Sequence, residues 1–197
     1  MAHPGDWISL ITAGAVLVSW LAFGAVFLHY RRSPTGKETR RERGWVLGFL
    51  LQMAGYATVW GLRRGLRPIA PMPAIAEAAF AVLTVGLAAG SIWVVVSAAN
   101  ALGKQWALTA RLVEGHELIT RGPYGRVRHP IYTGMFGLLL ATGLAISHWM
   151  ALAAAIALFW TGTVIRVRRE EKLLRQAFGT RFEEYARRVP AVLPGIY

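Results

Sequence analysis

The chain has 197 residues, of which 55% are hydrophobic and 16% are charged, a balance that is unusual for a soluble domain. It contains no cysteine, which excludes disulfides, cysteine nucleophiles and thiolate metal sites. Its formal net charge is +12, so its partners are either anionic surfaces or nucleic acid, and the distribution of the charge has to decide between them.

The hydrophobic residues are gathered into five runs, which predict an all-helical membrane protein with about five transmembrane helices. In chain order the runs are Trp7–Tyr30, Trp45–Leu62, Ala74–Ala99, Ile131–Ile146 and Trp149–Ile165. Because only two residues separate the last two runs, which are short, we expect them to form an antiparallel helical hairpin. Residues 1–99 are interpreted as a three-helix scaffold, and the polar residues that could carry chemistry lie in residues 100–197.

The lysines and arginines lie mostly on one side of this predicted topology. Six fall between runs one and two, five between runs three and four, and eight after run five, whereas three fall between runs two and three. With five spans, 19 basic residues share one side against 3 on the other, which predicts a multi-pass protein with its N-terminus outside and its C-terminus in the cytoplasm. The positive charge therefore indicates topology and attraction to anionic membrane lipids rather than nucleic-acid binding.

Two GxxxG spacings, at residues 44–48 and 86–90, would allow helices to pack closely. Glycine is common throughout the chain, with 21 residues, so the spacings are equally compatible with chance. They do not indicate whether a contact would lie within one chain or between two, and the oligomeric state is not predicted.

Residues 121–134, RGPYGRVRHPIYTG, place a Gly-Pro turn and several charges directly before the fourth run. Pro130 suits the first turn of a helix, and free N–H groups at a helix start can hold an anionic group. We interpret Arg126 and Arg128 as ordinary anchors to lipid phosphates. His129 gains nothing from such a role and is a candidate site residue.

The tail after the fifth run is predicted to be helical and to meet residues 100–130 at the same membrane face. A helix over 169–178 ends at Gly179. A shorter amphipathic piece over 180–189 places Phe182 and Tyr185 on one face, a pattern typical of a helix lying on anionic lipid.

Glu170 and Glu171 are adjacent in a chain that has ten acidic residues. Arg166 and Glu170 are spaced i, i+4, so they can pair on one helix face. Such a pair is either an exposed salt bridge of little energetic weight or part of a site for a zwitterion or a carboxylate. The residue chemistry alone favours neither interpretation.

Two motifs together resemble those of the isoprenylcysteine carboxyl methyltransferase family and its phospholipid N-methyltransferase relatives. The first is HELITRGPYGRVRHPIYTG at 116–134, and the second is RVRREEKLLRQAFGTRFEEYARRVPAVLP at 166–194. The resemblance covers about residues 100–194, roughly half the chain. It implies an integral membrane methyltransferase that uses S-adenosylmethionine and releases S-adenosylhomocysteine.

The resemblance also implies the roles of individual residues. The implied cofactor-binding residues are His116, Glu117, Leu118, Ile119, Tyr124, His129, Pro130, Ile131, Tyr132, Glu170 and Glu171. The implied catalytic residues, which would also face the acceptor, are Arg166 and Glu170.

The methyl acceptor implied by the resemblance is lipophilic, and Arg166 favours an isoprenylcysteine-like carboxylate. A carboxylate is already anionic and needs alignment and shelter from water rather than a base. A phospholipid amine or a small thiol would have to lose a proton, with Glu170 or Glu171 as the base. A sterol-type double bond is a further possible acceptor.

Two readings from other classes fit the sequence less well. A small membrane transporter or assembly protein would usually carry ionisable residues in mid-membrane, whereas Glu77 and His29 lie near the ends of their runs. A metal enzyme would need ligands at helix spacing, and the five histidines have none, so no metal is expected.

Overall fold

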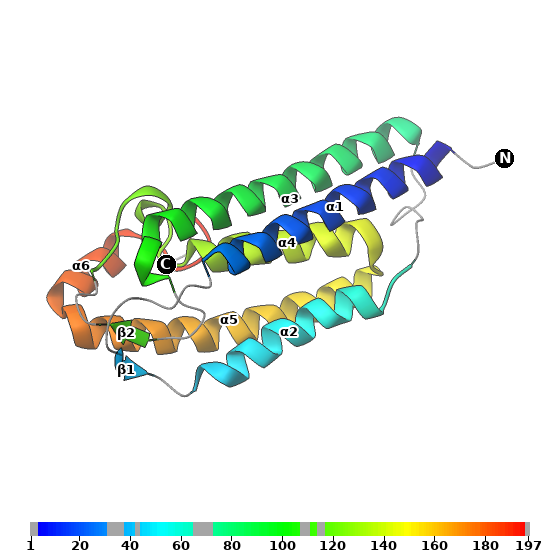
Figure 1. Cartoon of the computed structure of the whole chain (residues 1–197). Helices are drawn as coiled ribbons and strands as arrows, with labels where there is room; N and C mark the ends of the chain where they lie inside the picture. Colours follow the sequence, from blue (N-terminus) through cyan, green and yellow to red (C-terminus); the bar gives the residue numbers. More distant parts are fainter. Residues whose placement is uncertain are drawn as a thin grey trace.

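The computed structural model describes residues 4–30, 38–41, 44–64, 73–106, 111–113 and 117–195. Over these residues the chain forms six α-helices, two short 3-10 turns and one pair of short strands (Figure 1). The helices are α1 (Pro4–His29), α2 (Trp45–Gly61), α3 (Ala74–Leu102), α4 (Pro130–Ile146), α5 (Trp149–Phe178) and α6 (Thr180–Arg188). The 3-10 turns are η1 (Gly103–Gln105) and η2 (Gly122–Gly125), and the strands are β1 (Glu38–Arg41) and β2 (Arg111–Val113).

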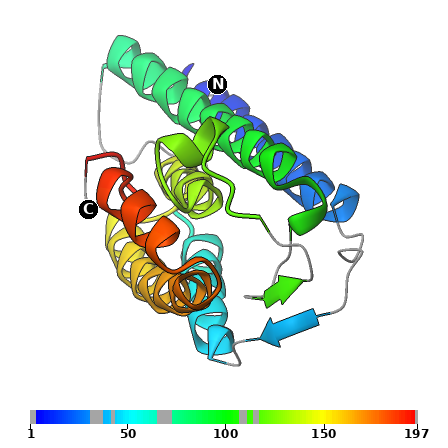
Figure 2. The same ribbon diagram turned by 90° about the vertical axis from the view of Figure 1, so that its left-hand side faces the viewer.

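The five long helices lie side by side in an elongated bundle, and α6 turns back across one end of it (Figures 1 and 2). α1 packs on α3 and α4, while α2 packs along α5. α4 lies between the two groups and buries most of its side chains, with Leu138 and Leu139 fully enclosed. The core therefore runs along α4, and the outer helices leave apolar faces uncovered.

In the part of the chain that the structure describes, three helical segments are long and apolar enough to cross a membrane: Trp7–His29, Ala74–Leu102 and Trp149–Phe178. α4 is shorter but equally apolar in character. Hydrophobic side chains such as Leu21 and Val82 are about two-thirds exposed on the outer faces, as expected for residues that contact lipid rather than water. The prediction of a helical membrane protein is confirmed, while the count of five spans stays a prediction.

The first four predicted runs begin and end within a few residues of a helix, and the fifth begins with α5 at Trp149. α4 starts at Pro130, and α5 ends before Gly179, whose φ is +52°. α5 continues from the fifth run directly into the tail as one helix of 30 residues. Such a helix is about 45 Å long, so it exceeds a hydrocarbon core of roughly 30 Å and its charged C-terminal part projects beyond the apolar layer.

The α4–α5 hairpin is confirmed, although each of its helices packs more extensively on another partner, α4 on α3 and α5 on α2. The strand pair was not predicted. β1 and β2 are antiparallel, with Arg41 opposite Arg111. This pairing joins the segment after α1 to the segment after α3, two segments that the charge distribution places on the same side of the membrane.

The two GxxxG spacings have different outcomes. A Cβ atom on Gly48 would lie 2.7 Å from the carbonyl oxygen of Gly162, so the backbones of α2 and α5 touch there. A Cβ atom on Gly86 or Gly90 would meet no neighbouring atom within 4 Å. The first spacing is thus a helix contact within the chain, and the second lies on an open face.

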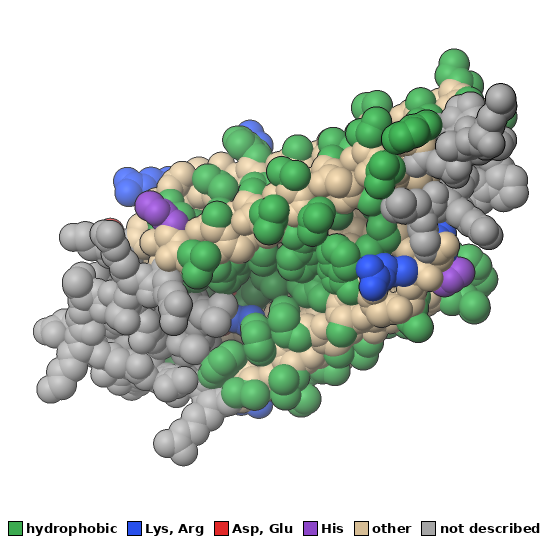
Figure 3. Space-filling view, turned by 45° about the vertical axis from the view of Figure 1, so that its right-hand side comes forward, with side chains coloured by type: hydrophobic (Ala, Val, Ile, Leu, Met, Phe, Trp, Pro, Cys, Tyr) green, Lys and Arg blue, Asp and Glu red, His purple; other side chains and the backbone are tan. Residues whose placement is uncertain are grey.

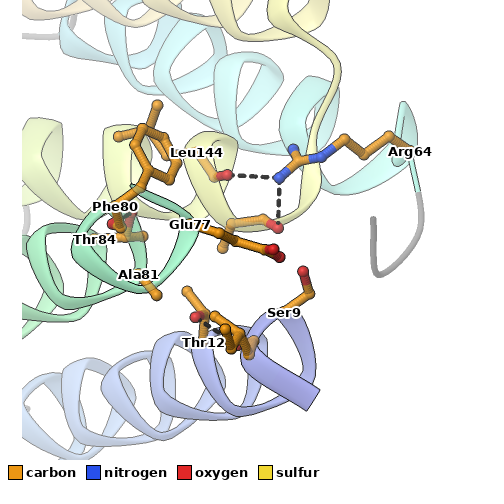
Figure 4. A pocket seen from close by; sticks show the side chains of 10 residues that line it. Ser9, Thr12, Arg64, Glu77, Phe80, Ala81, Thr84 and Leu144 are labelled. Atoms are coloured by element: carbon orange, nitrogen blue, oxygen red, sulfur yellow. Dashed lines mark hydrogen bonds between the residues drawn. The ribbon is translucent and has the colours of Figure 1, made fainter. Parts of the chain in front are cut away.

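The end of the bundle opposite α6 contains a small pocket between α1, α3 and the end of α4 (Figure 4). Glu77 is buried there, at 8% exposure, beside the hydroxyls of Thr12 and Thr84. Arg64 reaches in from the end of α2 and donates hydrogen bonds to the carbonyl oxygens of Leu144 (2.7 Å) and Ala145 (2.9 Å). The last carbonyls of α4, which have no partner within the helix, are therefore satisfied by this guanidinium.

Candidate functional site

The two sequence motifs meet at the end of the bundle that carries α6. The backbone N–H groups of Arg128 and His129 donate to the carbonyl oxygens of Pro190 and Ala191, both at 2.8 Å. The hydroxyl of Thr133 donates to the carbonyl oxygen of Val192 at 2.6 Å. These bonds fix the segment after α6 against the start of α4, so the predicted convergence of the two motifs is confirmed.

Glu171 is the buried and fully paired acid of this site. Its carboxylate accepts from Arg128 Nε (2.8 Å) and Arg175 Nη2 (3.1 Å), and His129 Nε2 lies 3.3 Å away. Burial alone would raise the pKa of Glu171, but the hydrogen bonds and charges of His129 and Arg128 outweigh it and lower the pKa to about 2. Glu171 therefore stays ionised and holds its three partners together.

Glu170 is the more open acid. Its side chain is 24% exposed, compared with 7% for Glu171. It accepts a hydrogen bond from the Tyr132 hydroxyl, lies 3.4 Å from His129 Nδ1, and lies 3.8 Å from Arg166 Nη2. Burial favours a raised pKa, yet His129 and Arg166 together lower the pKa of Glu170 below its usual value. Glu170 thus presents a permanent negative charge at the accessible side of the cluster.

His129 bridges the two acids, with one ring nitrogen toward each carboxylate. Burial lowers the pKa of His129, but the hydrogen bonds and charges of Glu170 and Glu171 outweigh burial and raise it. The charged imidazolium can donate from both nitrogens at once, which suits this geometry. His129 therefore fixes the positions of both carboxylates.

Arg166 is buried, with 5% exposure, and lies among aromatic rings. Its guanidinium carbon is 5.1 Å from the ring centre of Tyr132 and 5.9 Å from those of Trp45 and Phe49. Aromatic faces attract a cation without neutralising it. The guanidinium is therefore held in a buried, aromatic-lined setting, where it can pair strongly with an anionic group.

Tyr124 lies at the same site. Its carbonyl oxygen accepts a hydrogen bond from the buried Tyr185 hydroxyl at 2.6 Å. Burial raises the pKa of Tyr124, and the negative charge of Glu170 raises it further. The Phe182–Tyr185 face of α6 is buried in the protein, so it does not lie on lipid as its pattern indicated.

The structure brings together six of the predicted site residues: Tyr124, His129, Tyr132, Arg166, Glu170 and Glu171. Of the remaining ones, Pro130 is buried at the start of α4, and Ile131 packs against the core. His116 lies outside the described residues. Glu117 is exposed and its N–H donates to the Gln105 side chain, while Leu118 and Ile119 are half-buried, so the roles of these residues stay predictions.

Sequence reasoning missed two residues that belong to this cluster. The interpretation of Arg128 as a lipid anchor is wrong, because its side chain is 10% exposed and binds Glu171 and the carbonyl oxygens of Ala186 and Val189. Gln52 is the strongly polar residue of the second apolar run, and nothing in the sequence indicates that it contacts Arg166. Arg126 is exposed, as an anchor would be.

These features define a helical membrane protein with a paired-acid, histidine and arginine site at one end of its bundle. Residues 79–181, just over half of the chain, match the model of the phospholipid methyltransferase family, and the chain belongs to this family. The matched region runs from α3 to the first turn of α6 and includes all six clustered site residues.

The chain is also similar to several curated proteins, with each match covering less than half of the relative. It is 34% identical over 84 residues to protein-S-isoprenylcysteine O-methyltransferase B of Arabidopsis thaliana, covering 43% of each chain. It is 33% identical over 79 residues to protein-S-isoprenylcysteine O-methyltransferase of Schizosaccharomyces pombe, covering 40% of this chain and 34% of that protein. It is 37% identical over 99 residues to the cobalt-zinc-cadmium resistance protein CzcN of Cupriavidus metallidurans, covering 47% of this chain and 43% of that protein.

Proposed function

We propose that this protein transfers a methyl group from S-adenosylmethionine to a lipophilic acceptor in the membrane, and that the accepting group is a carboxylate. The observation that carries the proposal is the pairing of an open, ionised Glu170 with a buried, aromatic-lined Arg166 on one helix. Family membership and the similarity to isoprenylcysteine O-methyltransferases support it.

The residues present suit the charges of S-adenosylmethionine. When bound, this group supplies an electrophilic methyl on a sulfonium, and it also carries an ammonium and a carboxylate. Glu170 would offset the positive groups, since its carboxylate is ionised and partly open. The dipole of α4 favours an anionic group near its start, but the N–H groups of Arg128 and His129 are bonded to the segment after α6, so they would not hold the group directly. Tyr124 and Tyr132 would enclose the site on the side of η2 and α4.

The acceptor would bind through Arg166. An anionic head would pair with the guanidinium, while an apolar tail would lie along the bundle. Figure 3 shows a hollow lined by hydrophobic side chains on the side of the molecule where Figure 1 places α1 above α2. α1 and α2 each pack mainly on other helices and meet through the aromatic contacts of Trp20 with Tyr56 and Trp60, and an apolar tail would lie in the hollow beside these rings. The protein's contribution to transfer is alignment of the two groups and exclusion of water.

The acidity of Glu170 favours a carboxylate over an amine or thiol acceptor. An amine or thiol must lose a proton, and an efficient general base has a pKa near the working pH. The pKa of Glu170 is lowered, and that of Glu171 is lowered to about 2, so both are poor bases. A phospholipid amine and a small thiol are therefore the second and third candidates.

The test measures binding and transfer separately, on the full chain in lipid nanodiscs. Calorimetry with S-adenosylmethionine compares wild type with Glu170→Gln, and Glu184→Gln serves as control because Glu184 is an exposed carboxylate on α6. We expect Glu170→Gln to weaken binding at least tenfold and the control to bind within twofold of wild type. Labelled methyl transfer is then followed to N-acetyl-S-farnesylcysteine, phosphatidylethanolamine and a small alkyl thiol.

Arg166→Met separates the acceptor from the cofactor. We expect it to lower transfer to N-acetyl-S-farnesylcysteine at least 100-fold, because the carboxylate loses its charged partner, while cofactor affinity changes less than threefold. If wild type methylates only phosphatidylethanolamine or only the thiol, the carboxylate is rejected as the acceptor and that amine or thiol takes its place. A folded wild type that binds no S-adenosylmethionine would reject the methyltransferase proposal in favour of a non-enzymatic membrane protein.

A further inference from the structure

Gln52 is a fully buried amide in the middle of an apolar helix, and the mechanism above gives it no direct role. It lies on α2 with 0% exposure. A buried amide without hydrogen bonds is costly, and in a membrane helix water cannot replace them. Its two ends are in fact both paired, and the identity of the partners points to a role at the site.

The hydrogen bonds fix which way the amide points. The hydroxyl of Thr163 donates to the carbonyl oxygen of Phe159 at 2.8 Å, so its oxygen is left as an acceptor. Gln52 Nε2 donates to that oxygen at 2.9 Å. The carbonyl end of the amide must then point the other way, where Gln52 Oε1 accepts from Arg166 Nη1 at 3.2 Å. These hydrogen bonds therefore direct the uncharged carbonyl oxygen of Gln52 toward the guanidinium of Arg166.

The close contact between α2 and α5 brings the side chains of these two residues within reach of each other. A Cβ atom on Gly162 would lie 2.5 Å from the carbonyl oxygen of Gly48, so the two backbones touch. Because α2 and α5 run antiparallel, Gln52, one turn after Gly48, and Arg166, one turn after Gly162, lie on opposite sides of this contact, and their side chains reach toward each other past it. The backbone contact fixes the spacing of the two helices and so keeps both side chains within hydrogen-bonding reach.

We propose that Gln52 is a positioning residue that holds the guanidinium of Arg166 toward the acceptor group without neutralising its charge, and that it thereby determines the preference for a carboxylate. This inference rests on the proposed function for its acceptor class. An arginine side chain has many rotamers, and one hydrogen bond in a packed interface removes most of them. A glutamate at position 52 would hold Arg166 equally well but would add a second carboxylate to that of Glu170, whereas the amide adds no negative charge to compete with an anionic ligand.

The binding test uses the full chain in nanodiscs without methyl donor. The probes are N-acetyl-S-farnesylcysteine and its methyl ester, which differ in charge at the head group. We expect wild type to bind the acid at least tenfold more tightly than the ester, Gln52→Leu to reduce this ratio below threefold, and Gln52→Glu to abolish it. Thr142→Val is the matched control, because Thr142 is an equally buried hydroxyl that accepts from Trp20 at the α1–α4 contact. We expect it to keep the wild-type ratio even if its thermal stability falls.

A second measurement is independent of any acceptor. The ¹⁵N NMR signal of the Arg166 guanidinium, assigned by its loss in Arg166→Lys, should show slow rotation in wild type and Gln52→Glu and fast rotation in Gln52→Leu. Unchanged rotation and an unchanged acid-to-ester ratio in Gln52→Leu would overturn the positioning role. If wild type itself shows no preference for the acid, the carboxylate part of the proposed function fails, and the NMR comparison still decides whether Gln52 positions Arg166.

Discussion

The two ends of the helix bundle each hold a partly or fully buried arginine, and the described hydrogen bonds and contacts of the two arginines differ in kind. Arg64 donates to backbone carbonyl oxygens of α4, at Leu144 and Ala145 among others. Arg166 contacts side chains: the amide of Gln52, the carboxylate of Glu170 and aromatic rings.

This difference distinguishes an arginine that stabilises the fold from one that we propose binds the acceptor. Carbonyl groups at a helix end belong to the fold and cannot move without disturbing the helix, so a guanidinium bound to them acts as a cap. Side-chain partners can rearrange around a ligand, and aromatic faces leave the charge available. The end with Arg64 is therefore expected to determine stability, and the end with Arg166 to determine reactivity.

The largest effect on stability is expected for Arg64→Met. The substitution leaves several buried carbonyl groups at the end of α4 without a donor, which we expect to lower the free energy of unfolding by about 3 kcal/mol. The measurement is thermal unfolding in nanodiscs, where the midpoint should fall by roughly 10 °C. Affinity for S-adenosylmethionine in the folded protein should be unchanged. The control is Arg63→Met, since the Arg63 side chain is exposed; equal losses in both variants would contradict the cap.

A smaller effect is expected where α2 and α5 touch. Gly162→Ala forces a methyl group against the backbone of α2 and should lower the free energy of unfolding by about 2 kcal/mol. It should also reduce the preference for the acid over the ester, because it separates Gln52 from Arg166. Gly90→Ala is the matched control, since its Cβ would meet no atom within 4 Å, and helix propensity makes it neutral or stabilising by up to about 1 kcal/mol. Similar destabilisation by both substitutions would refute the assigned contact.

The smallest effect is a dependence on acid pH that belongs to the site end. The pKa of Glu171 is lowered from 4.5 to about 2 on folding, so its contribution to stability is present above pH 4.5 and is lost as the pH falls toward 2. After discounting for solvent screening, we expect a loss of roughly 1–2 kcal/mol. Thermal unfolding from pH 6 to pH 3 should be flatter for Glu171→Gln than for wild type. A parallel decline in the two proteins would assign the acid sensitivity to other groups.

The sequence was sufficient for the helices because their signals are local. Pro130 predicted where α4 begins, and Gly179 predicted where the helix of the tail ends. The positive φ of Gly179 agrees with its place after the last residue of α5. The sequence also predicted the pairing of Arg166 with Glu170, since i, i+4 neighbours on a helix meet whatever the fold.

The same sequence was insufficient wherever a partner comes from far along the chain. Arg128 binds Glu171, 43 residues away, and Gln52 binds Arg166, 114 residues away. Nor could the sequence assign different environments to Glu170 and Glu171, because one step of about 100° around α5 decides which carboxylate is enclosed and which is open. Only the packing of α4 and α6 against α5 fixes that choice.

α5 joins two environments in a single rod of 30 residues. Its first half presents an apolar surface of the kind that matches the thickness of a bilayer, and a mismatch in that thickness is met by tilting or by axial displacement. Arg166 and Glu170 lie one turn apart on the same rod, so any such displacement carries both of them by the same amount. A membrane of different thickness would therefore shift Arg166 and Glu170 together, without changing their spacing.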